Sequence, residues 1–155
     1  MGVFEVPIIA MHREEGRSRT NKPGMTEGLQ DSRKQRHGRV LVVDDDQIVI
    51  NAVRRILQRS GMDPESTTDA RKALDIYKKG GIDLVISDRQ MPGMDGLELL
   101  KVLKEFDPKV KVIIVSGGIS EKQTEEFLEA GASAVLEKVS MIKTLIKAVK
   151  RVLES

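Results

Sequence analysis

From residue 39 onward, short runs of apolar residues alternate with longer segments in which apolar positions recur at helical spacing. Continuous apolar runs of three or four residues, rich in valine, isoleucine and leucine, are typical of strands buried on both faces of a parallel sheet. A further run at 63–67 is weaker, because Pro64 cannot donate to a sheet ladder, and it predicts an edge strand. The four strong runs are 40–43, 84–86, 112–115 and 134–136.

The segments between the runs predict five helices. Asp46, Asp95, Ser120 and Ser140 are residue types that cap helices, and Gln123 has the spacing for a capping box with Ser120. The predicted helices span about 47–60, 70–79, 96–106, 120–131 and 140–153. The residues of the last helix that we expect to face the sheet are Ile142, Leu145, Ile146 and Val149.

This alternation predicts an α/β fold with a doubly wound, five-stranded parallel sheet. Strand-helix-strand crossovers are right-handed almost without exception, so the helices are expected on both faces of the sheet. Ligands of such sheets bind outside the carboxyl ends of the strands. The residues that follow the apolar runs are therefore the first place to look for chemistry.

Each strong run leads into a polar residue suited to phosphoryl chemistry. These residues are Asp44 and Asp45 after the first run, Asp88 after the second, Ser116 after the third and Lys138 after the fourth. In a parallel sheet all of them would lie along one edge. There they would place a metal site, a nucleophilic carboxylate, a hydroxyl and an ammonium group around one phosphoryl group.

Three consecutive acids, Asp44 to Asp46, follow the first run. Like charges held close together raise one another's pKa and destabilise a fold, and a divalent cation relieves the repulsion. Magnesium prefers oxygen ligands and commonly binds one or two carboxylates, so Asp44 and Asp45 are its candidate ligands, with Asp46 as a helix cap. The alternative is that all three acids are exposed cap and loop residues.

Asp88 is followed by a loop, residues 89–96, that contains a proline and two glycines. A carboxylate at this position can act as a nucleophile and form an aspartyl phosphate. Asp95 already supplies a cap for the next helix, so Asp88 is not needed for that role. Phosphoryl transfer requires mostly positioning and charge stabilisation, which a metal ion and Lys138 would supply. Taken singly, Ser116 can be a turn residue and Lys138 a solvated one, so only the set is specific.

Composition limits the other classes of function. The chain has no cysteine, which removes disulfides, thiolate metal sites and cysteine nucleophiles and is compatible with a reducing cytoplasm. No stretch approaches the roughly 20 apolar residues that span a bilayer. Residues 1–38 carry seven Lys/Arg, five Asp/Glu and little apolar periodicity, which predicts a disordered basic tail before a domain at 39–155.

The set Asp44-Asp45, Asp88 in Asp-Arg-Gln-Met-Pro-Gly-Met-Asp-Gly, Ser116 and Lys138 closely resembles the receiver domain of two-component response regulators. The resemblance implies a flavodoxin-like fold with strand order 2-1-3-4-5 and Asp88 as the phosphoacceptor. It also implies magnesium on Asp44, Asp45, Asp88 and the backbone carbonyl of Gln90. Ser116 and Lys138 would then sense the phosphoryl group.

The same resemblance implies partners and a role. A sensor histidine kinase or a phosphotransfer protein would supply the phosphoryl group, and a downstream protein would bind the surface of the fourth helix, fifth strand and fifth helix. We expect a stand-alone, cytoplasmic receiver that is not a turnover enzyme, does not bind specific DNA and does not enter a membrane.

Two positions depart from the family's usual pattern. Val139 stands where proline commonly follows the lysine, and Val135 stands where an aromatic residue often reports phosphorylation. One alternative is therefore an interaction module that keeps only the fold and works without phosphorylation. Another is a phosphatase of the haloacid-dehalogenase class with Asp44 as nucleophile, which leaves the Met-Pro-Gly-Met-Asp-Gly segment unexplained.

Overall fold

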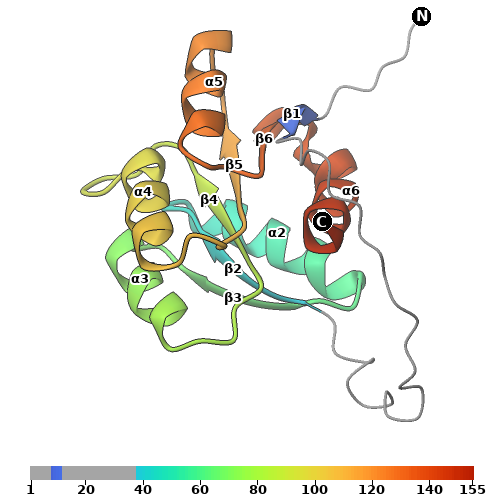
Figure 1. Ribbon diagram of the computed structural model, residues 1–155. Coiled ribbons are helices and arrows are strands. Elements are labelled where there is room, and N and C mark those ends of the chain that lie inside the picture. Colours follow the sequence, from blue (N-terminus) through green and yellow to red (C-terminus); the bar gives the residue numbers. More distant parts are fainter. Residues whose placement is uncertain (1–7, 12–37) are drawn as a thin grey trace, which may run out of the picture.

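The computed structural model describes residues 8–11 and 38–155. In these residues a single sheet has the strand order β1-β6-β5-β4-β2-β3, and helices lie on both of its faces (Figure 1). All neighbouring strands pair in parallel except β1, which pairs with β6 in the antiparallel direction. The strands are β1 (Ile8–Met11), β2 (Arg39–Val43), β3 (Asp63–Thr67), β4 (Leu84–Asp88), β5 (Val112–Ser116) and β6 (Ala134–Glu137).

The five parallel strands, counted along the chain from Arg39, stand in the order 2-1-3-4-5 across the sheet. This arrangement confirms the predicted doubly wound α/β fold. Strand β3, which contains Pro64, lies at an edge of the sheet, as its sequence predicts. Proline has no N–H to donate, and at an edge this costs no hydrogen bond between two central strands.

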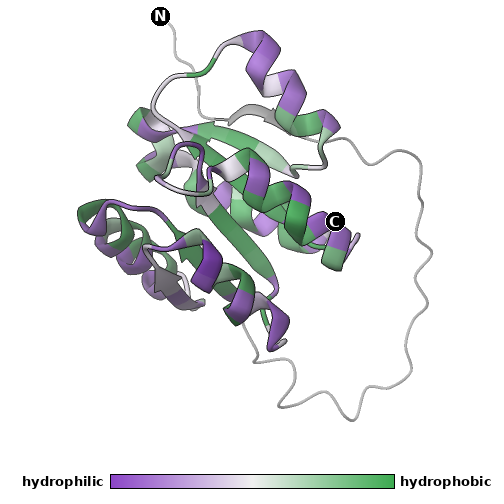
Figure 2. Cartoon of the chain, turned by 90° about the vertical axis from the view of Figure 1, so that its left-hand side faces the viewer, coloured by the Kyte–Doolittle hydropathy of each residue, from purple (hydrophilic) through white to green (hydrophobic). Residues whose placement is uncertain are grey.

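Two helices cover one face of the sheet and three cover the other. Hydrophobic residues line the strands and the sheet-facing sides of the helices, and hydrophilic residues lie on the outer sides (Figure 2). The first layer contains α2 (Gln47–Arg59) and α6 (Met141–Glu154). The second contains α3 (Ala70–Lys78), α4 (Gly96–Phe106) and α5 (Glu121–Glu129).

Successive side chains of β2 enter opposite layers. Val40 and Val42 pack with α2 and α6, whereas Leu41 and Val43 pack with the helices of the other face. All five residues of β4 and of β5 are buried. A buried valine, leucine or isoleucine stabilises the fold by about 1.5–3 kcal/mol, so these strands need apolar residues on both faces.

Three of the predicted helix caps are confirmed. The Asp46 carboxylate accepts a hydrogen bond from the backbone N–H two residues later, at 2.9 Å. Ser120 accepts one from the N–H of Gln123 at 3.1 Å, and the Gln123 side chain accepts one from the N–H of Ser120 at 3.0 Å. Asp95 forms a second capping box with Glu98. These bonds satisfy N–H groups that have no partner within their helices.

The prediction that Ser140 caps the last helix is wrong. Ser140 occupies the position before α6, but its side chain makes no capping hydrogen bond. A 3₁₀ turn at Lys138–Ser140 leads directly into the helix, and Ser140 has φ −108° and ψ 4°. A capping side chain acts from an extended backbone, which this turn does not provide.

The prediction that Ile142 faces the sheet is also wrong, because this residue is 67% exposed. The buried stripe of α6 begins at Met141 and recurs every three or four residues, so Ile142 points about 100° away from it. Leu145 and Val149 are buried against the sheet, as predicted, and Ile146 is partly buried beside them.

Strand β1 is an addition to the five predicted strands and lies within the segment predicted to be disordered. Its backbone pairs with the outer edge of β6, with Ile8 opposite Leu136 and Met11 opposite Ala134. An unpaired strand edge is a template for further pairing, and β1 covers this one. The rest of the predicted tail, 1–7 and 12–37, lies outside the described residues. Among the residues described, every helix is too short or too polar to cross a bilayer.

Gly96, the first residue of α4, packs against the backbone at the end of β4. A β-carbon at this position would overlap the carbonyl oxygen of Asp88 and lie 3.0 Å from the Cα of Arg89. The N–H of Gly96 donates to the carbonyl of Arg89 at 2.9 Å. Glycine therefore allows the start of α4 to dock directly on the strand that carries Asp88.

We expect Gly96→Ala to lower the free energy of unfolding by about 1–3 kcal/mol, because the added methyl group must displace backbone atoms. Urea unfolding monitored by circular dichroism measures the change. Gly117→Ala is the matched control, since a β-carbon there meets no atom within 4 Å, and it should stay within about 0.5 kcal/mol of the wild type. Equal midpoints for the two variants would contradict the close packing described at Gly96.

Candidate functional site

The carboxyl ends of four parallel strands meet at one edge of the sheet. Strands β2 and β4 pair in register up to the residues before Asp44 and Asp88, so these two aspartates emerge side by side. The pairing of β5 with β4 and with β6 brings Ser116 and Lys138 to the same edge. The sheet thus gathers the residues that the sequence singles out.

Lys138 joins two of these strand ends. Its Nζ lies 3.2 Å from Oδ2 of Asp44 and 3.2 Å from Oδ1 of Asp88. The two carboxylate side chains are only 5% and 8% exposed, and the lysine side chain is 27% exposed. Removing the ammonium group would leave two buried carboxylates without a counter-charge, which is strongly unfavourable.

The three consecutive acids at the end of β2 have three different environments. Asp44 is buried, and its Oδ1 accepts a hydrogen bond from the N–H of Asp46 at 2.8 Å. Asp46 caps α2, as the sequence predicts. Asp45 is exposed and lies between them. The acids are therefore not equivalent loop residues, since one is fixed inside, one supports the helix and one faces outward.

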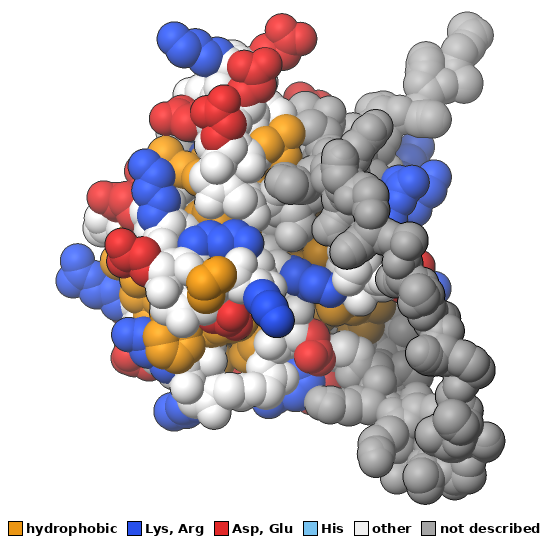
Figure 3. All heavy atoms as spheres, in the orientation of Figure 1, with side chains coloured by type: hydrophobic (Ala, Val, Ile, Leu, Met, Phe, Trp, Pro, Cys, Tyr) orange, Lys and Arg blue, Asp and Glu red, His pale blue; other side chains and the backbone are white. Residues whose placement is uncertain are grey.

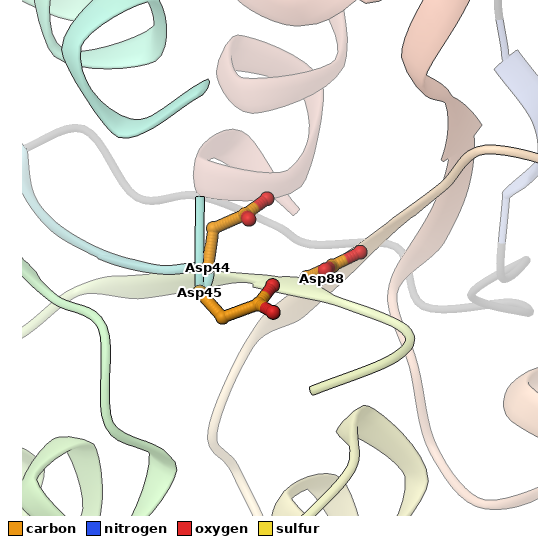
Figure 4. Close-up of side chains that lie close together, drawn as sticks. All are labelled: Asp44, Asp45 and Asp88. Atoms are coloured by element: carbon orange, nitrogen blue, oxygen red, sulfur yellow. The ribbon is translucent and has the colours of Figure 1, made fainter. Parts of the chain in front are cut away.

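Asp44, Asp45 and Asp88 form a cluster of carboxylates. Each contributes one oxygen such that these atoms all lie within 4.8 Å of one another. Figure 4 shows the side chains of Asp44 and Asp45 extending from the end of β2 on the side of Asp88. Hard divalent cations such as Mg²⁺ prefer carboxylate oxygens and accept water for the remaining positions, so this donor set fits the predicted metal.

Burial raises the pKa of Asp44, although the N–H of Asp46 and the charge of Lys138 act in the opposite direction. Burial also raises the pKa of Asp88, and the negative charge of Asp44 raises it further. Burial lowers the pKa of Lys138, but the two carboxylates outweigh that effect and raise it above its usual value. The ammonium group therefore stays charged, while each aspartate resists ionisation.

Ser116 lies at the same edge, and its hydroxyl is engaged by its own loop and by Arg89. The hydroxyl donates to the carbonyl of Gly118 at 2.9 Å and accepts from Nε of Arg89 at 2.9 Å. It also accepts from the N–H of Gly118 at 3.2 Å. The predicted role of Ser116 toward a phosphoryl group requires this hydroxyl to change partners.

Arg89 is a residue of the site that the sequence analysis did not single out. A basic residue directly after the candidate nucleophile was the signal available for it. Its side chain reaches from the end of β4 to the loop after β5, where it also donates to the carbonyl of Gly118 at 3.0 Å. The spacing of Arg89 and Ser116 along the chain does not reveal this contact.

The two positions that depart from the family pattern differ in exposure. Val135 is fully buried in the layer of α3, α4 and α5, whereas Val139 is 82% exposed. A buried valine at position 135 has no ring that could swing between inner and outer positions.

Gln90 follows Arg89 in the loop after β4. The role of its backbone carbonyl as a metal ligand stays a prediction.

Comparison with known proteins agrees with this geometry. The family model described as the response regulator receiver domain matches residues 40–150. The chain belongs to the response regulator receiver family. Receivers are signalling modules that interact with histidine kinases and downstream effectors.

Relatives of this receiver occur in plants and bacteria. It is 34% identical over 107 residues to two-component response regulator 24 of Arabidopsis thaliana, covering 68% of this chain and 77% of the relative. It is 30% identical to the receiver domain of the Francisella response regulator 1452, with a TM-score of 0.72 and coverage of 76% and 98%. The chain spans only 25% and 50% of the length of two other curated relatives, both named as regulators.

A second solved structure to which this chain is similar is a complex. It is the CheX-CheY-BeF3-Mg+2 complex from Borrelia burgdorferi, with 30% identity, a TM-score of 0.71 and coverage of 74% of this chain and 88% of that one. Because the match covers 74% of this chain, the similarity is one of fold and not of a short motif.

We expect Asp88→Asn to raise the free energy of unfolding of the receiver in metal-free buffer at pH 7. Burial and Asp44 raise the pKa of Asp88, so its ionised form opposes folding, and a neutral amide removes that penalty. The gain should appear as a higher urea midpoint for Asp88→Asn than for the wild type, measured in the presence of a chelator. Asp75→Asn, an exposed site on α3, is the control and should change stability little.

The pH dependence has a definite sign. The folded-state pKa of Asp88 lies above its unfolded value, so the folded protein binds more protons than the unfolded chain. The contribution of Asp88 to stability therefore falls as pH rises from about 4 through the folded pKa. Asp88→Asn should therefore gain most relative to the wild type near neutral pH and little near pH 4. A loss of stability at pH 7 would contradict the assignment.

Proposed function

We propose that Asp88 of this receiver accepts a phosphoryl group from a phosphohistidine on a sensor histidine kinase or a phosphotransfer protein. The observation that carries the proposal is the position of Lys138, whose Nζ is 3.2 Å from a carboxylate oxygen of both Asp44 and Asp88. A carboxylate nucleophile in phosphoryl transfer is helped by fixed positive charge beside it, and Lys138 supplies that charge next to the buried Asp88.

In the transfer, a carboxylate oxygen of Asp88 attacks phosphorus and forms a new P–O bond. The bond between phosphorus and the donor nitrogen breaks, and its electron pair leaves with the imidazole. Charge accumulates on the phosphoryl oxygens, where the ammonium group of Lys138 can stabilise it. Ser116 is the proposed hydroxyl donor to one of these oxygens. The product is the receiver phosphorylated on Asp88, which is the signalling form. We therefore propose a stoichiometric phosphoacceptor and not a turnover enzyme.

We propose that Asp44, Asp45 and Asp88 hold Mg²⁺ together with the backbone carbonyl of Gln90. The clustering of three carboxylates within 4.8 Å supports this assignment. When bound, the ion supplies positive charge beside the incoming phosphoryl oxygens. The similar CheX-CheY-BeF3-Mg+2 complex from Borrelia burgdorferi gives independent support for a metal and a phosphoryl-like group in this fold.

We propose that the downstream protein binds the face formed by α5, β6 and α6, where β1 pairs with the outer edge of β6. Strand β6 leads directly into Lys138, so a shift of that lysine is transmitted to this face. Acidic side chains gather in Figure 3 where Figure 1 places α5, and the exposed residues there are Glu121, Glu125, Glu126 and Glu129. Helix α6 exposes Lys143, Lys147, Lys150 and Arg151. A partner would therefore meet separate acidic and basic helices.

We also propose a cytoplasmic protein without specific DNA binding of its own. From Arg39 onward the chain has nineteen Lys/Arg and nineteen Asp/Glu, so the domain has no excess of positive charge for a polyanion. Binding of a specific DNA fragment by the phosphorylated protein in a gel-shift experiment would overturn this part of the proposal.

Acetyl phosphate with Mg²⁺ should place one base-labile phosphoryl group on Asp88, detected by a mass increase and by borohydride trapping. Asp88→Asn should abolish the label. Lys138→Ala should lower the extent of labelling at least about tenfold, because one charge-assisted contact is worth about 1.5–3 kcal/mol. A label on Asp44 would point instead to the haloacid-dehalogenase mechanism. An unlabelled wild type whose partner binding ignores the phosphodonor would support a phosphorylation-independent module.

Addition of Mg²⁺ should raise the melting temperature of the receiver near neutral pH, because the ion binds only the folded arrangement of carboxylates. The shift should shrink as pH falls, since burial raises the pKa of both Asp44 and Asp88 and protonated carboxyls bind the metal poorly. Sodium chloride at equal ionic strength is the control. Equal shifts with both salts would contradict a specific metal site.

A further inference from the structure

The guanidinium group of Arg89 bridges two elements with a fork of two hydrogen bonds. Nε donates to the hydroxyl of Ser116 at 2.9 Å, and Nη2 donates to the carbonyl of Gly118 at 3.0 Å. Arg89 directly follows β4, whereas its two acceptors lie at the end of β5 and in the loop before α5. The side chain thus connects the residue beside the phosphoacceptor with the loop that leads to the proposed partner face.

The hydrogen bonds around Ser116 form a closed set. A serine hydroxyl has one hydrogen to donate and two lone pairs that accept. The hydrogen goes to the carbonyl of Gly118, and the lone pairs accept from Arg89 and from the N–H of Gly118. Ser116 therefore cannot donate to a phosphoryl oxygen until its hydrogen leaves Gly118.

The backbone of Arg89 is held on both sides, in contrast to the loop that its side chain contacts. Its N–H donates to the carbonyl of Val115 at 3.0 Å, and its carbonyl accepts from the N–H of Gly96 at 2.9 Å. In the loop, added β-carbons at Gly117 and Gly118 would meet no atom within 4 Å. A rearrangement in this region therefore involves the Arg89 side chain and the open loop, not the strand.

A phosphoryl group on Asp88 would change the balance of charge around Arg89. It brings a charge of about −1.5 to −2 and strong acceptor oxygens to the neighbouring residue. Arginine binds phosphate oxygens with its planar fork more strongly than it binds neutral acceptors. The two acceptors that now hold Arg89 are a neutral hydroxyl and a neutral carbonyl, so the phosphoryl oxygens would compete with both.

We propose that Arg89 is a latch that holds Ser116 and the loop before α5 in the unphosphorylated conformation and that releases them when the phosphoryl group draws the guanidinium away. Ser116 is then free to turn its hydroxyl to the phosphoryl group. Arg89 is a positioning residue in this scheme. The holding step stands on the observed hydrogen bonds alone, whereas the release step rests on the proposed phosphorylation of Asp88.

The test is residue-resolved amide hydrogen exchange on the full chain. Without any phosphodonor, Arg89→Met should speed exchange at Gly118, whose N–H donates to Ser116, by about tenfold or more. Exchange within β5 and the sheet should stay unchanged, which shows that the variant is folded. Arg59→Met, an exposed arginine in the last turn of α2, is the matched control and should behave as the wild type.

Arg89→Lys separates the fork from the charge, because it keeps the positive charge but has a single nitrogen in place of the planar group. We expect it to restore less than the wild-type protection at Gly118. Unchanged exchange at Gly118 in Arg89→Met would overturn the latch. Full protection in Arg89→Lys would overturn the role of the fork.

The release step is tested with beryllofluoride and Mg²⁺, and fluorine NMR reports whether the anion is bound. In the wild type, binding should raise Gly118 exchange toward the level of Arg89→Met, and in that variant it should add little. A bound fluorine signal with unchanged Gly118 exchange would overturn the release. If the wild type binds no beryllofluoride, the proposed phosphorylation of Asp88 fails, while the Arg89→Met result still decides the holding step.

Discussion

Two buried carboxylates at the ends of neighbouring strands share one ammonium group, and the rest of the site depends on that arrangement. Lys138 is equally close to Asp44 and Asp88, although it lies on a different strand end from either. Like charges held this close in a poorly hydrated place repel each other, and the lysine offsets the repulsion only in part. A cation or phosphoryl group bound at this site would meet charges that are only partly balanced, so its binding would change the electrostatic balance among these three side chains.

The architecture explains how so few residues make such a site. Packing on both faces makes β2, β4, β5 and β6 a rigid support, because close-packed interiors resist displacement. The loops beyond the strand ends do not share that constraint. Functional side chains thus stand on a fixed base, while the segments next to them, such as the loop at Gly118, can change their hydrogen bonds. Arg89 lies at the boundary between the two, with its backbone held and its side chain reaching into the loop.

Local sequence patterns predicted the features that depend on residues close together in the chain. The caps at Asp46 and Ser120 were predictable because a capping side chain bonds to an N–H only two or three residues away. The burial of Ile142 was predicted wrongly, because a helix presents a face that depends on where its first turn begins, and the turn after Lys138 shifts that phase. Strand β1 was missed because its partner, β6, lies more than a hundred residues further along the chain, a separation at which apolar periodicity carries no information.

By itself, the sequence determined the alternating fold, the sheet edge on which the polar residues gather and the residue types that make phosphoryl chemistry feasible there. Periodicity and strand ends are local properties, and parallel pairing brings the strand ends together whatever the details of packing. Only the tertiary structure decided that Lys138 lies between Asp44 and Asp88, that Ser116 is bound by Arg89 and that β1 covers the edge of β6. Those contacts depend on side-chain directions and on pairings between distant segments, which the spacing of residues does not encode.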